Sequence, residues 1–375
     1  MIYCRTCLQP DTRPNTKFDA EGVCPACRYY ESLAEVDWDD RRAELDVILS
    51  ERKGRQSGGY DCIIGVSGGK DSTRQALFVK EVLGLNALLV CVGYPPEQVS
   101  QRGVDNISNL IYEGFDTLVV NPAPETWRKL MRHGFLTFQN WCKSTEMALF
   151  SGVPRMAIAY QIPVIFWGEN PALQLGDLGT AAKAGWDGNN LRYMNTLAGG
   201  DVSWMEKLVD SSSLLPYRYP HPQEFDQHQI QIVYLGYFWK EWSLLENGLF
   251  SSLRGLDVRA ESPAAIGDPH GVTSLDEDWV GMNQMIKYLK FGFGRITDYV
   301  NEDLRRGRMT REEGIALVER YDGCCADAYV ESFCEFIEIS VDEFWKIVGS
   351  CVNKKLFEQT GPREWKPRFK VGVGL

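Results

Sequence analysis

The sequence predicts an α/β protein built on a parallel sheet, with a small cysteine-rich unit before the sheet and a helical region after it. Apolar runs of strand length alternate with helical patterns between residues 60 and 240, as expected of strands joined by helical crossovers. Two Cys-x-x-Cys pairs stand near the start of the chain. Beyond residue 275 the apolar residues recur at helical spacing.

A chain of 375 residues has room for two or three domains. We expect the cysteine unit and a helical connector over residues 1–50, the sheet domain over 51–250 and the helical region over 251–375. The net charge of −11 argues against a broad nucleic-acid surface, which would be basic. No apolar run reaches the roughly 18 residues of a membrane span, and no signal peptide is apparent, so we expect a cytoplasmic protein.

The four N-terminal cysteines form the pattern Cys4-x-x-Cys7 and Cys24-x-x-Cys27, with sixteen residues between the pairs. Each pair can supply two thiolates to one tetrahedral ion, so the spacing predicts a site for Zn²⁺. Four protein ligands leave no open position, and the metal is therefore expected to be structural. Reduced cysteines without a metal are the alternative. The other seven cysteines show no ligand spacing and are expected mostly in the core.

The stretch Ser67-Gly68-Gly69-Lys70-Asp71-Ser72 separates a predicted strand at 62–66 from a predicted helix that starts at Asp71. Glycines let the backbone approach a ligand closely, and the first N–H groups of a helix have no intrahelical partner. Two serine hydroxyls and the charge of Lys70 add to this, so the stretch predicts a site for a phosphate chain. It is not a Walker A loop, because Asp71 stands where Ser or Thr is required.

Three further strands and three helices complete the predicted sheet domain before residue 170. The expected strands are 87–92, 117–120 and 163–167, and the expected helices are 99–112, 124–132 and 145–160, with Pro154 as a candidate break. Gly168-Glu169-Asn170 follows a strand end, where ligands bind in parallel sheets, and so could flank one cleft with the glycine loop. Its carboxylate and amide could bind Mg²⁺, ribose or adenine; a turn with its own hydrogen bonds is the alternative.

The rest of the chain is less regular at first and then helical. Residues 171–228 have no clear period and are interpreted as a lid or substrate-binding insertion, and 230–237 as a last strand. The region after 275 is expected to be helical, with capping boxes at Thr310 and Ser340. Five polar residues are expected to cluster around the turn 291–294, where they bind a ligand or simply mark a helix end: Asp268, His270, Lys290, Arg295 and Asp298.

The glycine loop resembles the pyrophosphate loop (PP-loop) of the ATP-pyrophosphatase superfamily. Together with the cysteine pairs, Gly168–Asn170 and the runs 290–298 and 308–313, it makes the chain resemble, nearly end to end, the N-acetyl sugar amidotransferases of surface-polysaccharide (LPS, O-antigen) biosynthesis. The resemblance implies an adenine nucleotide α-hydrolase-like PP-loop domain. It also implies an enzyme that uses ATP, releasing AMP and pyrophosphate, to convert an acetamido group of a nucleotide-linked sugar to an acetamidino group.

The same resemblance implies roles for residues and partners. The pyrophosphate would be held by Ser67, Gly68, Gly69 and Ser72, while Lys70 would neutralise charge or face the substrate. Asp71 would hold Mg²⁺ or cap the helix. Ammonia would come from separate glutaminase and cyclase-like proteins, since no glutaminase cysteine is apparent in the chain, and it would displace AMP from an O-adenylyl imidate.

Two other interpretations stay open. A PP-loop tRNA thiolase could use Cys142 as a sulfur carrier, although the acidic balance speaks against it. A non-catalytic nucleotide-binding scaffold is the second alternative. The sequence also leaves open which sugar and nucleotide carrier are used, and whether the chain forms a homo-oligomer.

Overall fold

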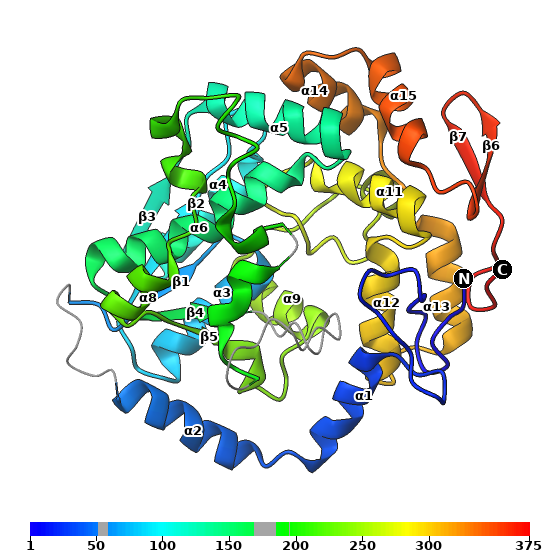
Figure 1. The fold of residues 1–375 in the computed structure, drawn as a ribbon. Coiled ribbons are helices and arrows are strands. Elements are labelled where there is room, and N and C mark those ends of the chain that lie inside the picture. Colours follow the sequence, from blue (N-terminus) through cyan, green and yellow to red (C-terminus); the bar gives the residue numbers. More distant parts are fainter. Residues whose placement is uncertain (52–58, 169–184, 195) are drawn as a thin grey trace.

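A five-stranded parallel sheet forms the centre of the computed structural model, which describes residues 1–51, 59–168, 185–194 and 196–375 (Figure 1). The strands are β1 Cys62–Gly65, β2 Ala87–Val92, β3 Thr117–Val120, β4 Val164–Trp167 and β5 Gln231–Tyr234. They pair in the order β3-β2-β1-β4-β5, all parallel. The order changes direction between β1 and β4, and such a switch point opens a crevice at the carboxyl ends of the strands.

Helices cover both faces of the sheet. They include α3 Lys70–Glu81, α4 Gln101–Tyr112, α5 Pro124–Phe138 and α6 Cys142–Tyr160, with α8 Pro222–His228 and α9 Leu244–Ser252 following later in the chain. Successive strand residues point to opposite faces. Ile64 therefore packs in one apolar cluster with Leu77 of α3, whereas Ile63 packs in another with Val153 of α6.

Several predicted elements need correction. The structure continues α6 through Pro154, so the predicted break is wrong. The helix lies against β1, β2 and β4, and this packing outweighs the one backbone hydrogen bond that a proline removes. Helix α5 runs on to Phe138 instead of ending at Arg132. The last strand ends at Tyr234, and a short 3₁₀ turn, Leu235–Tyr237, takes up the rest of the predicted strand.

The C-terminal region is mostly helical, as predicted. Its helices are α10 Pro263–Ile266, α11 Val280–Phe291, α12 Arg295–Arg305, α13 Arg311–Tyr321, α14 Asp327–Ile337 and α15 Val341–Cys351. The capping box at Thr310 is confirmed. The one predicted at Ser340 forms only in part: the Ser340 side chain accepts from the Glu343 N–H, and α15 shows no return bond from the Glu343 side chain. A hairpin of β6 Phe357–Gly361 and β7 Glu364–Pro367 was not predicted. Its residues are mostly polar and exposed, and they lack the alternating apolar pattern of a buried strand.

The N-terminal cysteine unit packs on the C-terminal helices, beside the C-terminus of the chain (Figure 1). Leu8 is fully buried in the core that these helices share, and its N–H donates to Asn301 Oδ1 of α12 at 2.7 Å. Arg311 donates to the Cys7 carbonyl at 2.7 Å. The connector that follows consists of α1 Pro25–Ser32 and α2 Trp38–Ser50. The unit thus belongs physically with the end of the chain.

The described part of the predicted insertion is folded against the sheet. Asp187 forms a β-bridge with Val233 of β5, and Tyr217 and Tyr219 are buried. Residues 171–184 and 195 lie outside the described residues, so the role of the insertion as a lid stays a prediction. Among the described helices, none has both the length and the apolar character that a membrane crossing needs.

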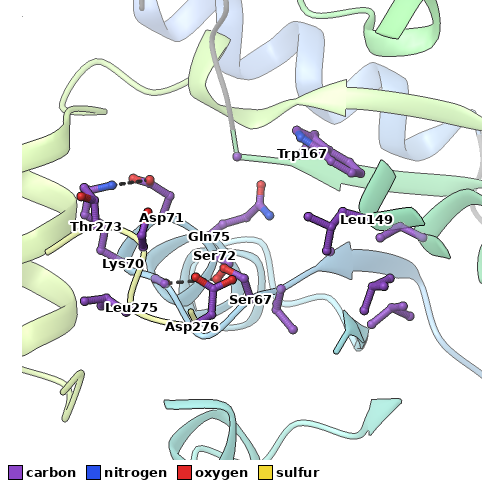
Figure 2. Close-up of a pocket in the computed structure, with 18 of the residues that line it drawn as sticks. Ser67, Lys70, Asp71, Ser72, Gln75, Leu149, Trp167, Thr273, Leu275 and Asp276 are labelled. Atoms are coloured by element: carbon purple, nitrogen blue, oxygen red, sulfur yellow. Dashed lines mark hydrogen bonds and ion pairs between the residues drawn. The ribbon is translucent and has the colours of Figure 1, made fainter. Parts of the chain in front are cut away.

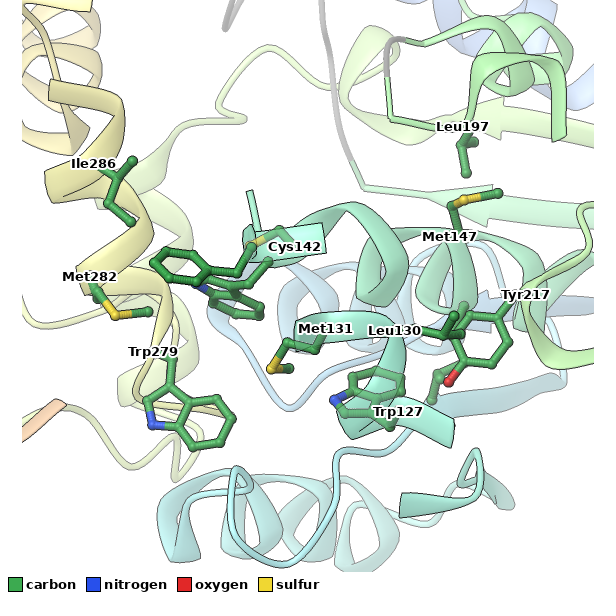
Figure 3. Close-up of a cluster of buried hydrophobic side chains, with 14 of the residues drawn as sticks. Trp127, Leu130, Met131, Cys142, Met147, Leu197, Tyr217, Trp279, Met282 and Ile286 are labelled. Carbon is green, nitrogen blue, oxygen red and sulfur yellow. The ribbon is translucent and has the colours of Figure 1, made fainter. Parts of the chain in front are cut away.

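The largest core joins the sheet domain to the C-terminal region. In Figure 3, Met282 and Ile286 of α11 lie near Met131 of α5 and Cys142 of α6. All four belong to one continuous buried cluster. This shared core fixes the position of α11 relative to the sheet.

The close contact of α6 with β2 depends on Gly152. A Cβ atom at this position would lie 2.3 Å from Val92 Cγ2, and a valine side chain has little freedom to move away. We expect Gly152→Ala to lower the free energy of unfolding by about 1–3 kcal/mol. Gly349→Ala in α15 is the matched control, because its nearest neighbour would be 3.5 Å away; it should be neutral or stabilising by up to about 1 kcal/mol. Urea unfolding of both variants measures this, and equal stabilities would contradict the packing account.

Candidate functional site

A hollow of about 390 Å³ lies at the carboxyl ends of β1 and β4, at the switch point of the sheet. Its walls come from five places: the loop at 65–72 with Gln75 after it, Leu149, Phe150 and Val153 of α6, the end of β4 at Trp167 and Gly168, the C-terminal segment 272–276, and Val90 and Val92 of β2 with Tyr94 after them. Figure 2 shows side chains from these places around one space. The loop and the residues after β4 were predicted to flank one cleft, and the structure brings Gly168 and the loop to the same hollow.

The loop has the conformation that its glycines permit. Gly68 has φ +75°, and a Cβ there would lie 3.0 Å from the Gly103 carbonyl oxygen of α4. Gly69 precedes α3 as its N-cap residue, and the Ser72 hydroxyl donates to the Gly69 carbonyl at 3.0 Å. The first-turn N–H groups of α3 thus begin at the hollow, where a helix presents partial positive charge.

Lys70 and Asp71 form an ion pair at the start of α3. The Lys70 ammonium is nearly buried and donates to Asp71 Oδ2 at 2.5 Å. Asn247 of α9 donates to Asp71 Oδ1 at 2.6 Å, and the Ser251 hydroxyl donates to the Lys70 carbonyl at 2.8 Å. The carboxylate of Asp71 therefore accepts from side chains and provides no side-chain cap for α3, whose N-cap is Gly69.

Gln75 contributes an unpaired polar atom to the hollow. It is 1 % exposed, and within the described part of the chain its Oε1 has no hydrogen-bond donor. A buried amide oxygen without a donor is unfavourable by about 1–3 kcal/mol, so the site fits a partner that brings an N–H or O–H group. Sequence reasoning missed Gln75, although it stands four residues after Asp71 and hence on the same helix face.

Gly168 leaves room beside this atom. A Cβ there would lie 3.1 Å from Gln75 Oε1 and 3.2 Å from the Trp242 ring. The other two residues of the predicted turn, Glu169 and Asn170, lie outside the described residues.

The segment 272–276, which was not predicted to take part, is held by many polar contacts. The Thr273 hydroxyl donates to Asp268 at 2.6 Å and accepts from Arg295 at 3.0 Å and from Tyr299 at 2.6 Å. The buried Arg259 guanidinium donates to main-chain carbonyls of this segment. These contacts join residues distant in sequence, and no local pattern marks them.

The predicted cluster of five polar residues around the turn 291–294 is wrong as a single site. Asp268 and Arg295 meet at Thr273 beside the hollow, and His270 lies near Asp303, at 3.7 Å. Lys290 lines a different hollow, and Asp298 pairs with Lys287, which lines the same hollow. Nearness in sequence was the basis of the prediction, but Arg295 and Asp298, which both follow the turn, contact different parts of the chain.

Helix α4 provides a second support for the segment. A Cβ on Gly103 would lie 2.5 Å from the Asp276 Cα, and Ser100 donates to the Leu275 and Asp276 carbonyls at 2.6 and 2.9 Å. Asp276 itself lines the hollow, and burial raises the pKa of its carboxyl group. The glycine at 103 thus permits direct backbone contact between α4 and the segment 272–276.

The four N-terminal cysteines form a potential metal centre. Their Sγ atoms all lie within 4.8 Å of one another and are buried. The Cys4–Cys27 and Cys7–Cys24 Sγ distances are 3.9 and 3.7 Å. Four thiolates about 2.3 Å from one tetrahedral ion would be about 3.8 Å apart, so the cluster fits a single ion. Among the described residues no other His, Cys, Asp or Glu group meets the same criterion.

Cys142, by contrast, is a core residue. It is 6 % exposed and packs among apolar side chains (Figure 3). Burial raises the pKa of its thiol well above the usual value. A thiol in this setting is a poor nucleophile, because the thiolate is the reactive form.

Comparison with known proteins finds one matching domain family and two similar solved structures. Residues 272–370 match a family model described as "LPS biosynthesis protein WbpG-like, C-terminal domain". No curated protein matches the chain. The chain is similar to the NH3-dependent NAD synthetase from Campylobacter jejuni subsp. jejuni NCTC 11168, solved in complex with the nitrate ion, with 17 % identity and a TM-score of 0.30 over 38 % of this chain and 61 % of that chain.

It is also similar to the U34-tRNA thiolase NcsA from Methanococcus maripaludis, solved with its 4Fe-4S cluster. Identity is 15 % and the TM-score 0.31, over 85 % of this chain and 89 % of that chain.

The buried Glu277 follows the segment 272–276 and caps α11. It accepts from the N–H groups of Trp279 and Val280 at 2.7 and 2.8 Å. Burial, helped by the charge of Asp276, raises the pKa of Glu277 from 4.5 to about 7. Its charged form is thus disfavoured in the folded chain.

Stability should consequently fall as the pH rises through this window. Below pH 4.5 Glu277 is protonated in both the folded and the unfolded chain. Between pH 4.5 and 7 the unfolded chain loses this proton while the folded chain keeps it. Above pH 7 the free energy of unfolding is therefore lower by about 3 kcal/mol than below pH 4.5. Glu277→Gln should remove this pH-dependent loss of stability. Glu335→Gln, at an exposed position of α14, should leave it unchanged. Chemical unfolding at pH 5, 6, 7 and 8 tests the difference, and parallel curves for all three proteins would refute it.

Proposed function

We propose that the chain is an ATP-dependent N-acetyl sugar amidotransferase that converts an acetamido group of a nucleotide-linked sugar to an acetamidino group. One observation carries the proposal. The segment 272–276 belongs to the part that matches an LPS-biosynthesis domain, and it lines the same hollow as the phosphate-type loop 67–72. A polysaccharide-biosynthesis domain and a nucleotide-type loop therefore contribute to one site.

The reaction needs an activated amide. The amide oxygen of the sugar attacks the α-phosphorus of ATP, forming a P–O bond while the bond to pyrophosphate breaks. The resulting O-adenylyl imidate has AMP as its leaving group. Ammonia then adds to the imidate carbon and the C–O bond to AMP breaks, which leaves the amidine. Both steps need positioning and neutralisation of phosphate charge more than acid–base chemistry.

In this proposal the loop residues hold ATP by its outer phosphates. Ser67, Gly68, Gly69 and Ser72 offer hydroxyl and N–H donors, and Lys70 offers a positive charge. Asp71 would hold Mg²⁺ through a carboxylate oxygen, the kind of ligand that Mg²⁺ prefers. Glu169 and Asn170 stay candidate nucleotide or Mg²⁺ ligands, and Gln75 accepts a hydrogen bond from the bound nucleotide or sugar.

Ammonia is proposed to come from separate glutaminase and cyclase-like partners. Cys142 is buried, which disfavours its use as a glutaminase nucleophile and equally as the sulfur carrier of a thiolase. The four-cysteine site is proposed to hold structural Zn²⁺. The domain limits 1–50, 51–250 and 251–375 also stay a prediction.

Product analysis tests the reaction. The purified chain, given ATP, Mg²⁺, ammonium and a panel of UDP- and CMP-linked N-acetyl sugars, should release AMP and pyrophosphate and replace the acetamido carbonyl oxygen by NH. Lys70→Met should lower kcat/KM roughly 10²–10³-fold, because a charge aimed at the phosphates is lost. Lys80→Met is the control, since Lys80 lies at the exposed end of the same helix. Release of ADP would exclude the mechanism.

Metal analysis tests the cysteine site. The chain should carry about one Zn²⁺, and Cys7→Ser should lose it together with several degrees of Tm, because a structural metal binds only the folded unit. Cys351→Ser, which lies outside the cluster, should keep both. Iron with visible absorption in place of zinc would contradict the assignment.

A further inference from the structure

A second hollow of about 410 Å³ lies between the N-terminal unit, the α5–α6 connection and α11. Three cations line it: Arg13 from the cysteine unit, and Lys287 and Lys290 from α11. Asn140 and Asn283 add uncharged polar groups. Among the described residues no carboxylate lines this hollow, although the chain as a whole carries a net charge of −11.

The charges around this hollow do not balance. One carboxylate, Asp298, pairs with both Arg13 and Lys287, the latter at 2.8 Å. Lys290 donates to the carbonyl oxygens of Gln139 and Phe138 at 2.9 and 3.4 Å, and within the described chain it has no carboxylate partner. Three positive charges thus face one negative charge.

A further carboxylate nearby does not restore the balance. Asp322 accepts from the N–H groups of Gly294 and Ile296 and from the Thr297 hydroxyl at the start of α12. Burial raises the pKa of Asp322 to about 6. Its oxygens are therefore committed to α12, and an excess of positive charge stays at the hollow.

Two of the cations are also held against an aromatic ring. The Arg13 guanidinium and the Lys287 ammonium lie 4.4 and 4.6 Å from the centre of the buried Phe293 ring. Burial lowers the pKa of Lys287 and of Lys290. Asp298 joins Arg13 and Lys287, but holding three partly desolvated cations around one carboxylate is unfavourable unless a further anion joins them.

We propose that this hollow binds a phosphate-bearing anion through Lys290, Lys287 and Arg13. Arg13 already donates to Gln9 and Asp298 through Nε and Nη2, and its charge and remaining N–H donors, with the two ammonium groups, suit phosphate oxygens. The asparagine amides suit a polar group attached to the phosphate. The anion is either the phosphate part of a nucleotide or a free inorganic phosphate or pyrophosphate. The site is separate from the loop hollow and does not depend on the amidotransfer proposal.

Calorimetric titration of the full, metal-loaded chain tests this site. UDP, GDP, dTDP, CMP, pyrophosphate and phosphate are titrated with and without a saturating non-hydrolysable ATP analogue. At least one probe should bind with the analogue present, and Lys290→Gln should weaken that binding roughly ten- to a hundredfold through the loss of a charged hydrogen bond. Lys290→Arg should retain most of it. Lys207→Gln removes the same charge from an exposed residue that lines neither hollow and should change nothing.

The outcomes separate the sources and the alternatives. Tighter binding of a nucleotide than of phosphate or pyrophosphate identifies a nucleotide as the occupant; equal binding identifies the free anion. The proposal is overturned if no probe binds, if Lys290→Gln behaves as Lys207→Gln does, or if the analogue abolishes all binding. Because the readout is binding, the result stands whether or not AMP is formed.

Discussion

The candidate site depends on three backbone segments that touch with no side chain between them. A Cβ on Gly68 would meet the Gly103 carbonyl at 3.0 Å, and a Cβ on Gly103 would meet the Asp276 Cα at 2.5 Å. The phosphate-type loop, the start of α4 and the C-terminal segment therefore form a continuous layer. A side chain at either glycine would push these segments apart. The shape of the site therefore depends on the absence of a Cβ atom at Gly68 and Gly103.

This contact makes the C-terminal region part of the site as well as its support. The sheet and its loop alone would leave the hollow open on the side of residues 272–276. Arg259 and Arg295 fix that side through hydrogen bonds to its main chain and hydroxyl groups. The part of the chain that matches an LPS-biosynthesis domain thereby contributes one wall of the hollow.

Patterns within short stretches of sequence predicted those features of the structure that short-range interactions determine. The strand 117–120, the start of the loop helix and the cysteine cluster were foreseen because period, glycine spacing and ligand spacing act over short stretches. Pro154 was misjudged because packing against three strands holds α6 together. The wall at 272–276 and the separation of Lys290 from Arg295 arise from contacts between distant parts of the chain, which spacing cannot reveal.

Net charge was also an incomplete guide to partners. A charge of −11 argues against a long nucleic-acid surface, yet it says little about a hollow whose own cations are partly desolvated. Charges in such surroundings act with a lower effective dielectric constant than exposed ones, so a few well-placed groups outweigh many on the surface. Lys70 at the loop and the three cations that line the second hollow are placed in this way. Under the two proposals, a small phosphate that enters either hollow meets positive charge there, whatever the net charge of the whole chain.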